Sequence, residues 1–432
     1  MRRTQSDRGA AITAACLFGW VALLVAAHLR GRALLAAGER LFLGFPPLHA
    51  TWEPRVTLLV LAPIAVAAAV IVWGPDLASR ARWTHLMYAS WGAAAAWAVA
   101  LAATDGWTAL TTPLTHPTEY LRVVPGISDP LRFLRTFTER IGAYPTHVQG
   151  HPPGFVLLLW LLDSVGLSGP GPAAAVLIAA GASAVPAVAL AARDLAGEDQ
   201  ARRALPFLVL VPAAVWVATS ADALFMALAA WGFSCFVRAA LRPGGEGDVL
   251  AAGSGLAFGT GLFMTYGMAP FGLSVIAVAG VLRRVRPLLV GGAAVGAVAV
   301  AFLAGGFWWY DGLQATVVRY VAGAGGTRPD SYFWWANLAA FAVAVGPAAV
   351  AGAARLRDLR LWLPLAAVLL AVCAATASGM SKAEVERIWL PFVPWTVLAC
   401  VSLWTGKAAV RAWLAGQAAV ALAVQLLLRS PW

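Results

Sequence analysis

The chain has 432 residues, of which 61% are hydrophobic and 12% are charged. A water-soluble fold cannot bury so much apolar surface, and apolar stretches of about 20 residues, long enough to cross a bilayer, recur throughout the sequence. The net charge of +11 resides largely in Arg residues of short connecting segments. That pattern is typical of membrane orientation signals rather than of nucleic-acid binding. The composition therefore predicts a polytopic membrane protein and excludes a soluble enzyme.

The apolar stretches predict an all-α fold with about thirteen transmembrane helices, since the period-two alternation of a membrane β-barrel is missing. The predicted spans are 11–28, 56–73, 84–103, 172–192, 204–219, 221–238, 249–265, 268–282, 287–306, 334–353, 359–377, 388–404 and 409–427. The basic segment 1–9 leads into a span rather than a cleaved signal peptide, because no small-residue cleavage site and soluble domain follow it. The cysteines fall within apolar stretches without metal-like spacing, so we expect core residues and no disulfide framework.

The distribution of Lys and Arg predicts the orientation of the chain. With the N-terminus in the cytoplasm, the short Arg-rich loops face inward, the C-terminus faces outward, and three longer polar segments lie outside. These extracytoplasmic segments are 104–171, 307–333 and 378–387. Long loops in compact proteins usually carry function, so we expect the site there. The Ala-, Gly- and Arg-rich, Lys-poor composition is typical of a bacterium, which indicates its plasma membrane.

The segment "YPTHVQGHPPGFVLLLWLLDSVG" (144–166) joins a polar hinge to a short apolar run. The run covers about 13 residues, fewer than the roughly 20 that a span needs. If it spanned, every later Arg-rich loop would face outward. We therefore predict a juxtamembrane or re-entrant helix over 152–167, started by Pro152 and Pro153. Upstream, "DPLRFLRTFTERIG" (129–142) predicts an amphipathic helix that lies on the membrane surface.

Ionisable residues in the first long loop are candidates for chemistry. Asp105, where the third predicted span ends, and Glu119 lie beside apolar sequence, where a carboxylate can act as a base. Each is alternatively a solvated loop acid or a capping residue. His147 and His151 could bind phosphate or metal, although loop histidines are commonly solvated or bonded to backbone. Asp222, at an outer re-entry, either caps the next helix or projects into a site.

The other two outer segments carry further charged candidates. In "SGMSKAEVERIWLPF", Lys382, Glu386 and Arg387 lie just outside a predicted span, and Arg319 lies in the aromatic segment 307–333. Arg suits two-pronged contact with phosphate oxygens, and Lys supplies a point charge. The alternative is interfacial snorkelling with surface ion pairs. Nucleotide-binding, metalloprotease and nucleophile-elbow motifs are absent from the sequence, and no residue pattern compels a metal site.

Together these features resemble the GT-C superfamily of membrane glycosyltransferases, which includes protein O-mannosyltransferases and the aminoarabinose transferase that modifies lipid A. The matching features are an acid near the start of the first long outer loop, the amphipathic helix near 129–141, and "HPPGFVLLL" (151–159), which is similar to an "HPPL"-type motif. On this basis 1–432 is a single membrane domain. It holds two extra N-terminal spans in 1–83, a GT-C-like core in 84–240 and C-terminal spans in 241–432.

The resemblance implies a polyprenyl-phosphate-linked sugar donor and an extracytoplasmic glycan, lipid or protein acceptor. Glu119 or Asp105 would deprotonate the acceptor hydroxyl, which would attack the anomeric carbon with inversion. Arg387, Lys382 and His151 would stabilise the leaving phosphate. The superfamily also allows a divalent cation, Mg or Mn, and no other cofactor is implied.

Two other classes of function are compatible with the sequence. A transporter or lipid flippase would place polar groups near the bilayer midplane and often shows two related halves. Here the predicted spans are almost free of charge and we find no halves. A non-enzymatic scaffold would leave the three polar outer segments unexplained.

Overall fold

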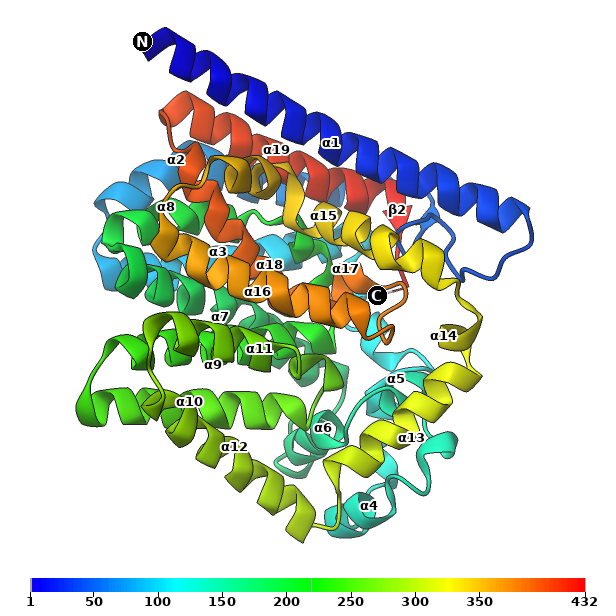
Figure 1. Cartoon of the computed structure of the whole chain (residues 1–432). Coiled ribbons are helices and arrows are strands. Elements are labelled where there is room, and N and C mark those ends of the chain that lie inside the picture. The colour runs from blue at the N-terminus through cyan, green and yellow to red at the C-terminus, as the bar shows by residue number, and fades with distance from the viewer. Residues whose placement is uncertain (1, 219, 432) are drawn as a thin grey trace.

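The computed structural model describes residues 2–218 and 220–431, and helices make up nearly all of it (Figure 1). The first part of the chain forms α1 (Arg2–Ala36), β1 (Thr51–Trp52), η1 (Leu58–Val60), α2 (Leu61–Arg80), α3 (Trp83–Ala102) and the 3-10 turn η2 (Ala103–Asp105). The long loop that follows contains only short elements. They are η3 (Trp107–Leu110), η4 (Thr112–Thr115), η5 (Tyr120–Arg122), η6 (Val124–Gly126), α4 (Pro130–Thr136), η7 (Ile141–Ala143), α5 (Thr146–Gln149) and α6 (Gly154–Ser164).

The rest of the chain returns to longer helices. The middle comprises α7 (Pro170–Ala196), α8 (Glu198–Val209), η8 (Pro212–Trp216), α9 (Ala221–Leu241), α10 (Gly244–Leu262), η9 (Tyr266–Met268), α11 (Phe271–Leu282) and α12 (Arg286–Ala304). The last part comprises α13 (Trp309–Ala322), α14 (Ala324–Thr327), α15 (Asp330–Arg355), α16 (Leu359–Ala377), α17 (Val385–Ile388), η10 (Leu390–Phe392), α18 (Val393–Val397), η11 (Leu398–Leu403), α19 (Lys407–Leu427) and β2 (Leu428–Arg429).

Within the described residues, 9 helices are long and apolar enough to cross a membrane. They are Gly9–Ala36, Leu58–Arg80, Trp83–Asp105, Pro170–Ala196, Ala221–Leu241, Arg286–Ala304, Asp330–Arg355, Leu359–Ala377 and Lys407–Leu427. Each coincides with a predicted span, which confirms an α-helical membrane protein of multi-pass architecture. The other predicted spans, 204–219, 249–265, 268–282 and 388–404, fall on shorter or less apolar helical segments, and residue 219 lies outside the described residues. The total number of spans therefore stays a prediction.

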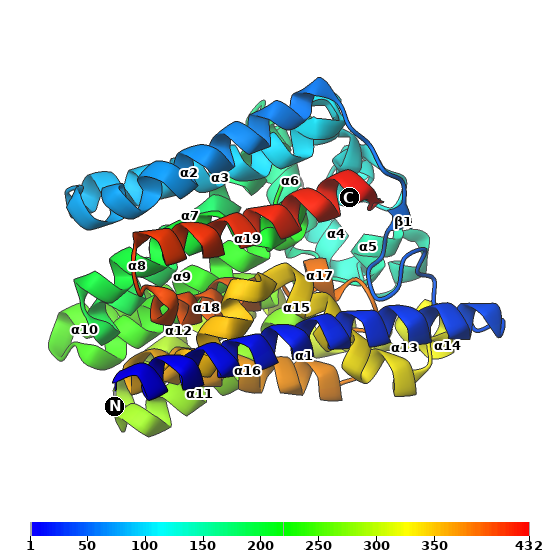
Figure 2. The same cartoon turned by 90° about the horizontal axis from the view of Figure 1, so that it is seen from above.

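The long helices run side by side, and the short elements gather at one end of the bundle (Figure 1). This end, called the loop end below, carries α4, α5, α6, α13, α14 and α17. At the opposite end the connections are only a few residues long, as between α2 and α3 and between α7 and α8. Seen from above, α19 lies between the α2–α3 pair and α1 (Figure 2).

Small residues let the helices approach closely. Helix α10 packs on α12 where Gly255 faces Gly291, and a Cβ atom at 255 would overlap the carbonyl of Gly291. Such close contacts replace hydrophobic driving force as the source of helix association in a membrane. Helix α15 is kinked at Gly346, which has φ 78° and precedes Pro347. The buried Gln417 side chain accepts a hydrogen bond from the Ala348 N–H and donates one to the Val345 carbonyl, so the kink leaves these groups satisfied.

The two short helices predicted in the first long loop are both present. Helix α6 has 11 residues, so its length of about 16 Å is roughly half of a bilayer core. Its first residue, Gly154, donates its N–H to the Phe263 carbonyl at 2.8 Å, and a Cβ atom there would overlap that carbonyl. Helix α4 ends at Thr136 rather than near 141, since residues 137–140 form turns. Asp129 caps its N-terminus by accepting from the Leu131 and Arg132 N–H groups.

The connection between α1 and α2 meets the end of the chain at the loop end. Strand β1 pairs antiparallel with β2, with Thr51 opposite Arg429 and Trp52 opposite Leu428. The Arg55 side chain extends this junction by donating to the carbonyl oxygens of Gln425 and Leu428 at 3.0 and 2.9 Å. Residues from the first connection are thereby fixed against the C-terminal end of α19.

Candidate functional site

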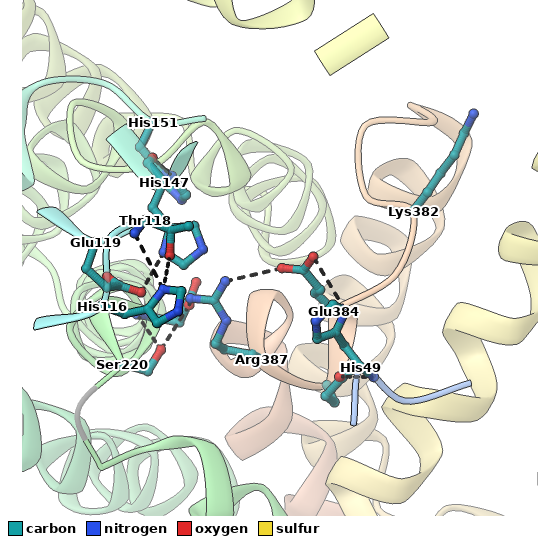
Figure 3. Close-up of polar contacts among 12 residues, drawn as sticks. His49, His116, Thr118, Glu119, His147, His151, Ser220, Lys382, Glu384 and Arg387 are labelled. Carbon is teal, nitrogen blue, oxygen red and sulfur yellow. Dashed lines mark hydrogen bonds and ion pairs between the residues drawn. The ribbon is translucent and has the colours of Figure 1, made fainter. Parts of the chain in front are cut away.

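The loop end brings together most of the site residues expected from the sequence. Glu119 comes from the first long loop, His147 from α5, Asp222 from the start of α9, and Glu386 and Arg387 from α17. Figure 3 shows Arg387 between Glu119 on one side and Glu384 on the other. These side chains are largely buried, so their contacts determine their charges.

Glu119 and His147 form the closest ion pair of this group. The Glu119 Oε1 atom lies 2.6 Å from Nδ1 of His147. The His147 N–H also donates to the Thr118 carbonyl at 3.1 Å, which holds α5 against the loop that carries Glu119. Burial raises the pKa of Glu119, but the His147 hydrogen bond and the Arg387 charge outweigh it, so the pKa is lowered overall. Glu119 is therefore an ionised carboxylate, which is the form that a base requires.

His151 lies behind this pair as a neutral ring. Its Nδ1 atom is 2.9 Å from the His147 carbonyl and 2.9 Å from the Tyr120 hydroxyl. A carbonyl oxygen only accepts hydrogen bonds, so this contact places the ring proton on Nδ1. Burial, the largest effect, lowers the His151 pKa to about 4. His151 thus orders the loop without adding positive charge near neutral pH.

Asp222 and Arg387 form a second, more deeply buried ion pair. Arg387 Nη1 lies 2.9 Å from Asp222 Oδ2, and the two side chains are 6% and 5% exposed. Ser220 caps α9 by accepting from the Asp222 N–H, so Asp222 is not the cap and its carboxylate is available to Arg387. Burial lowers the pKa of Arg387, but the charges of Asp222, Glu384 and Glu119 raise it more, which keeps the guanidinium charged.

The segment before Arg387 has an unusual backbone. Ala383 and Glu384 have φ angles of 71° and 62°, a left-handed conformation that costs energy in residues other than glycine. Asn337 accepts a hydrogen bond from the Ala383 N–H and donates to the Ser381 carbonyl. This conformation turns Glu384 towards Arg387, at 3.5 Å, and towards Arg328, at 3.6 Å.

Lys382 and Arg319, expected to bind phosphate, lie outside this cluster. The Lys382 Nζ atom donates to the carbonyl oxygens of Gly325 and Arg328 and forms an ion pair with Asp330 at 2.9 Å. Arg319 is exposed on α13 and donates to the side chain of Gln149 at 3.1 Å. Both residues hold neighbouring loops in the observed structure.

Asp105 is placed apart from Glu119, in a second polar group. Its Oδ1 atom lies 3.1 Å from Arg55 Nε, and its Oδ2 atom accepts from Gln425 at 3.4 Å. His49 lies between the two groups, since it lines the same pocket as Arg55 and Asp105 while its N–H donates to Glu386 Oε1 at 2.9 Å and its ring lies 4.0 Å from Glu384. Sequence reasoning missed His49 and Arg55 as site residues, because no motif marks the connection between α1 and α2. It also missed Glu384, whose left-handed backbone cannot be inferred from the sequence.

The arrangement of potential metal ligands among the described residues bears on the expected divalent cation. Across residues 2–218 and 220–431, no group of three His, Cys, Asp or Glu side chains is arranged to hold a metal ion. Glu119, Asp222 and Glu384 each contact a histidine or an arginine instead. The cysteines are free thiols, and of these Cys400 is buried whereas Cys373 is exposed, so the expectation of core residues is wrong for Cys373. Comparison with protein-family models and with curated proteins finds no match for this chain.

Proposed function

We propose that the protein is a membrane glycosyltransferase that moves a sugar from a polyprenyl-phosphate-linked donor onto an acceptor hydroxyl. The observation that carries this proposal is the meeting of a buried Glu119–His147 pair and a buried Asp222–Arg387 pair at one end of bilayer-length helices. The first pair supplies the ionised carboxylate of Glu119, and the second supplies the guanidinium of Arg387. The two groups are close enough that the charge of Arg387 lowers the pKa of Glu119. Such a combination suits a reaction that removes a proton from one group and leaves negative charge on another.

In the proposed reaction, Glu119 takes the proton of the acceptor hydroxyl. The oxygen then attacks the anomeric carbon, and a new carbon–oxygen bond forms as the bond to the donor phosphate breaks. The configuration at that carbon inverts, and polyprenyl phosphate leaves with the bonding electrons. Arg387 stabilises the developing phosphate charge, because Asp222 and Glu384 hold its guanidinium in position. His147 keeps Glu119 ionised and oriented.

Asp105 is the alternative base, and its surroundings make it the weaker candidate. Its carboxylate is paired with Arg55 and bonded to Gln425, whereas Glu119 lies close enough to Arg387 for that charge to lower its pKa. A base and the group that stabilises the leaving phosphate must act on neighbouring atoms of one substrate pair. We therefore assign the base to Glu119 and a binding role to Asp105.

The proposed orientation places the loop end outside the bacterial plasma membrane, with the N-terminus in the cytoplasm. Support comes from the short connections at the opposite end, which include Arg80, Arg82, Arg242 and Arg283. Fusion of reporter enzymes after residues 104 and 243 tests it. Activity of a periplasm-dependent reporter at the first position and of a cytoplasm-dependent reporter at the second is expected, and the reverse would contradict the orientation.

A gene deletion with complementation tests the proposed function. Mass spectrometry of lipid extracts is expected to show accumulation of one polyprenyl-phosphate sugar in the deletion strain. Wild-type protein and the control variant Glu139→Gln, which changes an exposed carboxyl group, should restore the wild-type profile, and Glu119→Gln should not. Full restoration by both Glu119→Gln and Asp105→Asn would contradict the site. A lipid-linked sugar that only changes membrane face would indicate a flippase instead.

A further inference from the structure

A pocket at the loop end lies beside the proposed catalytic pairs and takes no part in the bond-making and bond-breaking steps described above. Its empty volume, including the mouth, is about 380 Å³. Its polar lining residues come from four separate parts of the chain and are His49, Arg55, Asp105, Glu386, Gln425 and Ser430. We call it the Arg55 pocket. Trp216 and Val424 contribute apolar surface to the same lining.

Arg55 presents an unused hydrogen-bond donor in this pocket. Its Nη2 atom donates to the carbonyl oxygens of Gln425 and Leu428, and its Nε atom lies 3.1 Å from Asp105. Its Nη1 atom is buried and has no hydrogen-bond partner within the described part of the chain. A buried donor without a partner costs about 1–3 kcal/mol, so the arrangement is best explained by a bound group that accepts.

Glu386 presents the complementary group. Its side chain is 1% exposed, and its Oε1 atom accepts from the His49 N–H. Its Oε2 atom is buried and, among residues 2–218 and 220–431, has no hydrogen-bond partner. Burial raises the Glu386 pKa to about 7. The carboxyl group therefore exchanges a proton near neutral pH, and can accept or donate a hydrogen bond.

The charges in the pocket select against ions. Arg55 is balanced by Asp105, so an added anion would meet Asp105 and Glu386 without a spare positive charge. An added cation would find the charge of Asp105 already offset by Arg55, and Glu386 holds its own proton through part of the neutral range. A hydroxyl group suits the pocket because it can donate to Glu386 Oε2 and accept from Arg55 Nη1. The apolar side chains of Trp216 and Val424 lie in the same lining as these polar groups. Such a mixed lining suits a molecule that has carbon–hydrogen surface between its hydroxyl groups.

We propose that the Arg55 pocket binds hydroxyl groups of a neutral sugar, with Glu386 and Arg55 as its hydrogen-bonding pair. The assignment of that sugar as a substrate of transfer rests on the proposed function, whereas the binding itself does not. The polar atoms of the pocket would contact one edge of the sugar ring, and the rest of the ring would lie at the mouth. Asp105 then holds Arg55 in position for binding.

Saturation-transfer NMR on the full chain in lipid nanodiscs tests the proposal. The probes are methyl glycosides of mannose, glucose, galactose and arabinose, with inorganic phosphate and tetramethylammonium as anionic and cationic comparators. At least one glycoside is expected to bind, without competition from either ion. Glu386→Leu should weaken this binding by about 10–100-fold, the loss expected for a hydrogen bond to a charged group. Glu386→Gln, which keeps an acceptor, should weaken it less.

Two matched variants make the result decisive. Ala50→Leu places extra volume in the pocket without removing a polar group and is expected to abolish binding, so it decides the question if Glu386→Leu fails to fold. Glu139→Gln changes an exposed carboxyl group and should leave binding unchanged. Absence of signal for every glycoside would indicate a water-filled pocket only and overturn the proposal. Binding that Ala50→Leu does not alter, or that phosphate displaces, would overturn it as well.

The same experiment separates this inference from the proposed function. Glu119→Gln should retain glycoside binding while it loses transfer, because Glu119 is not part of the Arg55 pocket. If the deletion strain shows no change in lipid-linked sugars but glycosides still bind, the proposed transfer fails and the pocket assignment stands. If transfer is established but no glycoside binds, only the pocket assignment fails.

Discussion

Arg387 and Asp222 form a buried ion pair between two parts of the chain that are distant in the sequence, with 2.9 Å between Nη1 and Oδ2. Such a pair is costly to break from one side, because the remaining charge stays buried. We expect Arg387→Met and Asp222→Asn each to lower the free energy of unfolding by about 3–5 kcal/mol, and the double variant to lose less than the sum. Chemical denaturation in detergent provides the measurement.

The exposed pair Arg360–Asp358, also at 2.9 Å, is the control for that experiment. Arg360→Met should cost less than about 1 kcal/mol, because water screens surface ion pairs. Equal effects at the buried and exposed pairs would show that Asp222 and Arg387 are separated in the membrane-bound protein.

The acid limb of the pH–rate profile should depend on His147. The His147 hydrogen bond is the main influence that lowers the Glu119 pKa against the effect of burial. Its removal in His147→Ala should move the acid limb of sugar transfer to higher pH, because Glu119 then takes up a proton more readily. Initial rates measured across the acid range check this. An unchanged limb with a lower rate would assign His147 a purely structural role.

Glu386 should make stability depend on pH near neutrality. Its pKa is about 7 in the folded protein and 4.5 in the reference state. The folded state therefore binds the Glu386 proton more tightly than the unfolded state does. The resulting stabilisation of the fold is complete below the reference pKa and is lost as the pH rises through the folded-state pKa. This difference between the two pKa values corresponds to on the order of 3 kcal/mol in the free energy of unfolding. The melting temperature of the wild-type protein should decrease as the pH is raised from about 4.5 to about 7. Glu386→Gln should reduce this dependence on pH, whereas Glu139→Gln should not.

Lys382 should be required for order in α14. Its ammonium group binds two carbonyl oxygens, of Gly325 and Arg328, and the Asp330 carboxylate. Lys382→Met keeps most of the volume but removes these contacts, so amide hydrogen exchange over residues 323–330 should accelerate roughly tenfold or more, for a loss of about 1.4 kcal/mol. Exchange in α15 beyond Asn337 should not change. Uniform acceleration across both segments would indicate general destabilisation instead.

Gly154 should resist the substitution that would complete the "HPPL"-type motif. A side chain at this position would overlap the Phe263 carbonyl, to which Gly154 itself donates a hydrogen bond. Gly154→Leu should lower the free energy of unfolding by about 1–3 kcal/mol or more, the cost of overpacking. Gly166→Ala is unsuitable as a control because its φ is 83°. Gly171→Ala, where a Cβ atom meets open space, should have little effect.

The sequence predicted the long helices well because one physical property, apolar length, determines whether a segment can cross a bilayer. It also singled out Glu119, Asp222 and Arg387, since ionisable residues are rare in such a chain. It could not tell that Asp222 pairs with Arg387 instead of capping α9, because a cap and an ion pair require the same residue at the same place.

The separation of Asp105 from Glu119 could not be predicted from the sequence either. Both acids follow α3 in one loop, and only the return of the first connection and of α19 gives Asp105 its partners Arg55 and Gln425. Contacts between the first and last parts of a chain leave no periodic pattern and no short motif. They depend on the order in which many helices pack, which local sequence does not specify.

The pairing of β1 with β2 has a consequence for biogenesis. The Arg55 pocket needs His49 and Arg55 from the first connection and Gln425 and Ser430 from beyond the middle of α19. During synthesis, His49 and Arg55 therefore emerge long before the rest of the pocket. Arg55 lacks its backbone acceptors until the final helix, α19, has been inserted. A chain that ends before residue 425 lacks the backbone acceptors of Arg55 and part of the pocket lining, so the last residues of α19 complete the pocket.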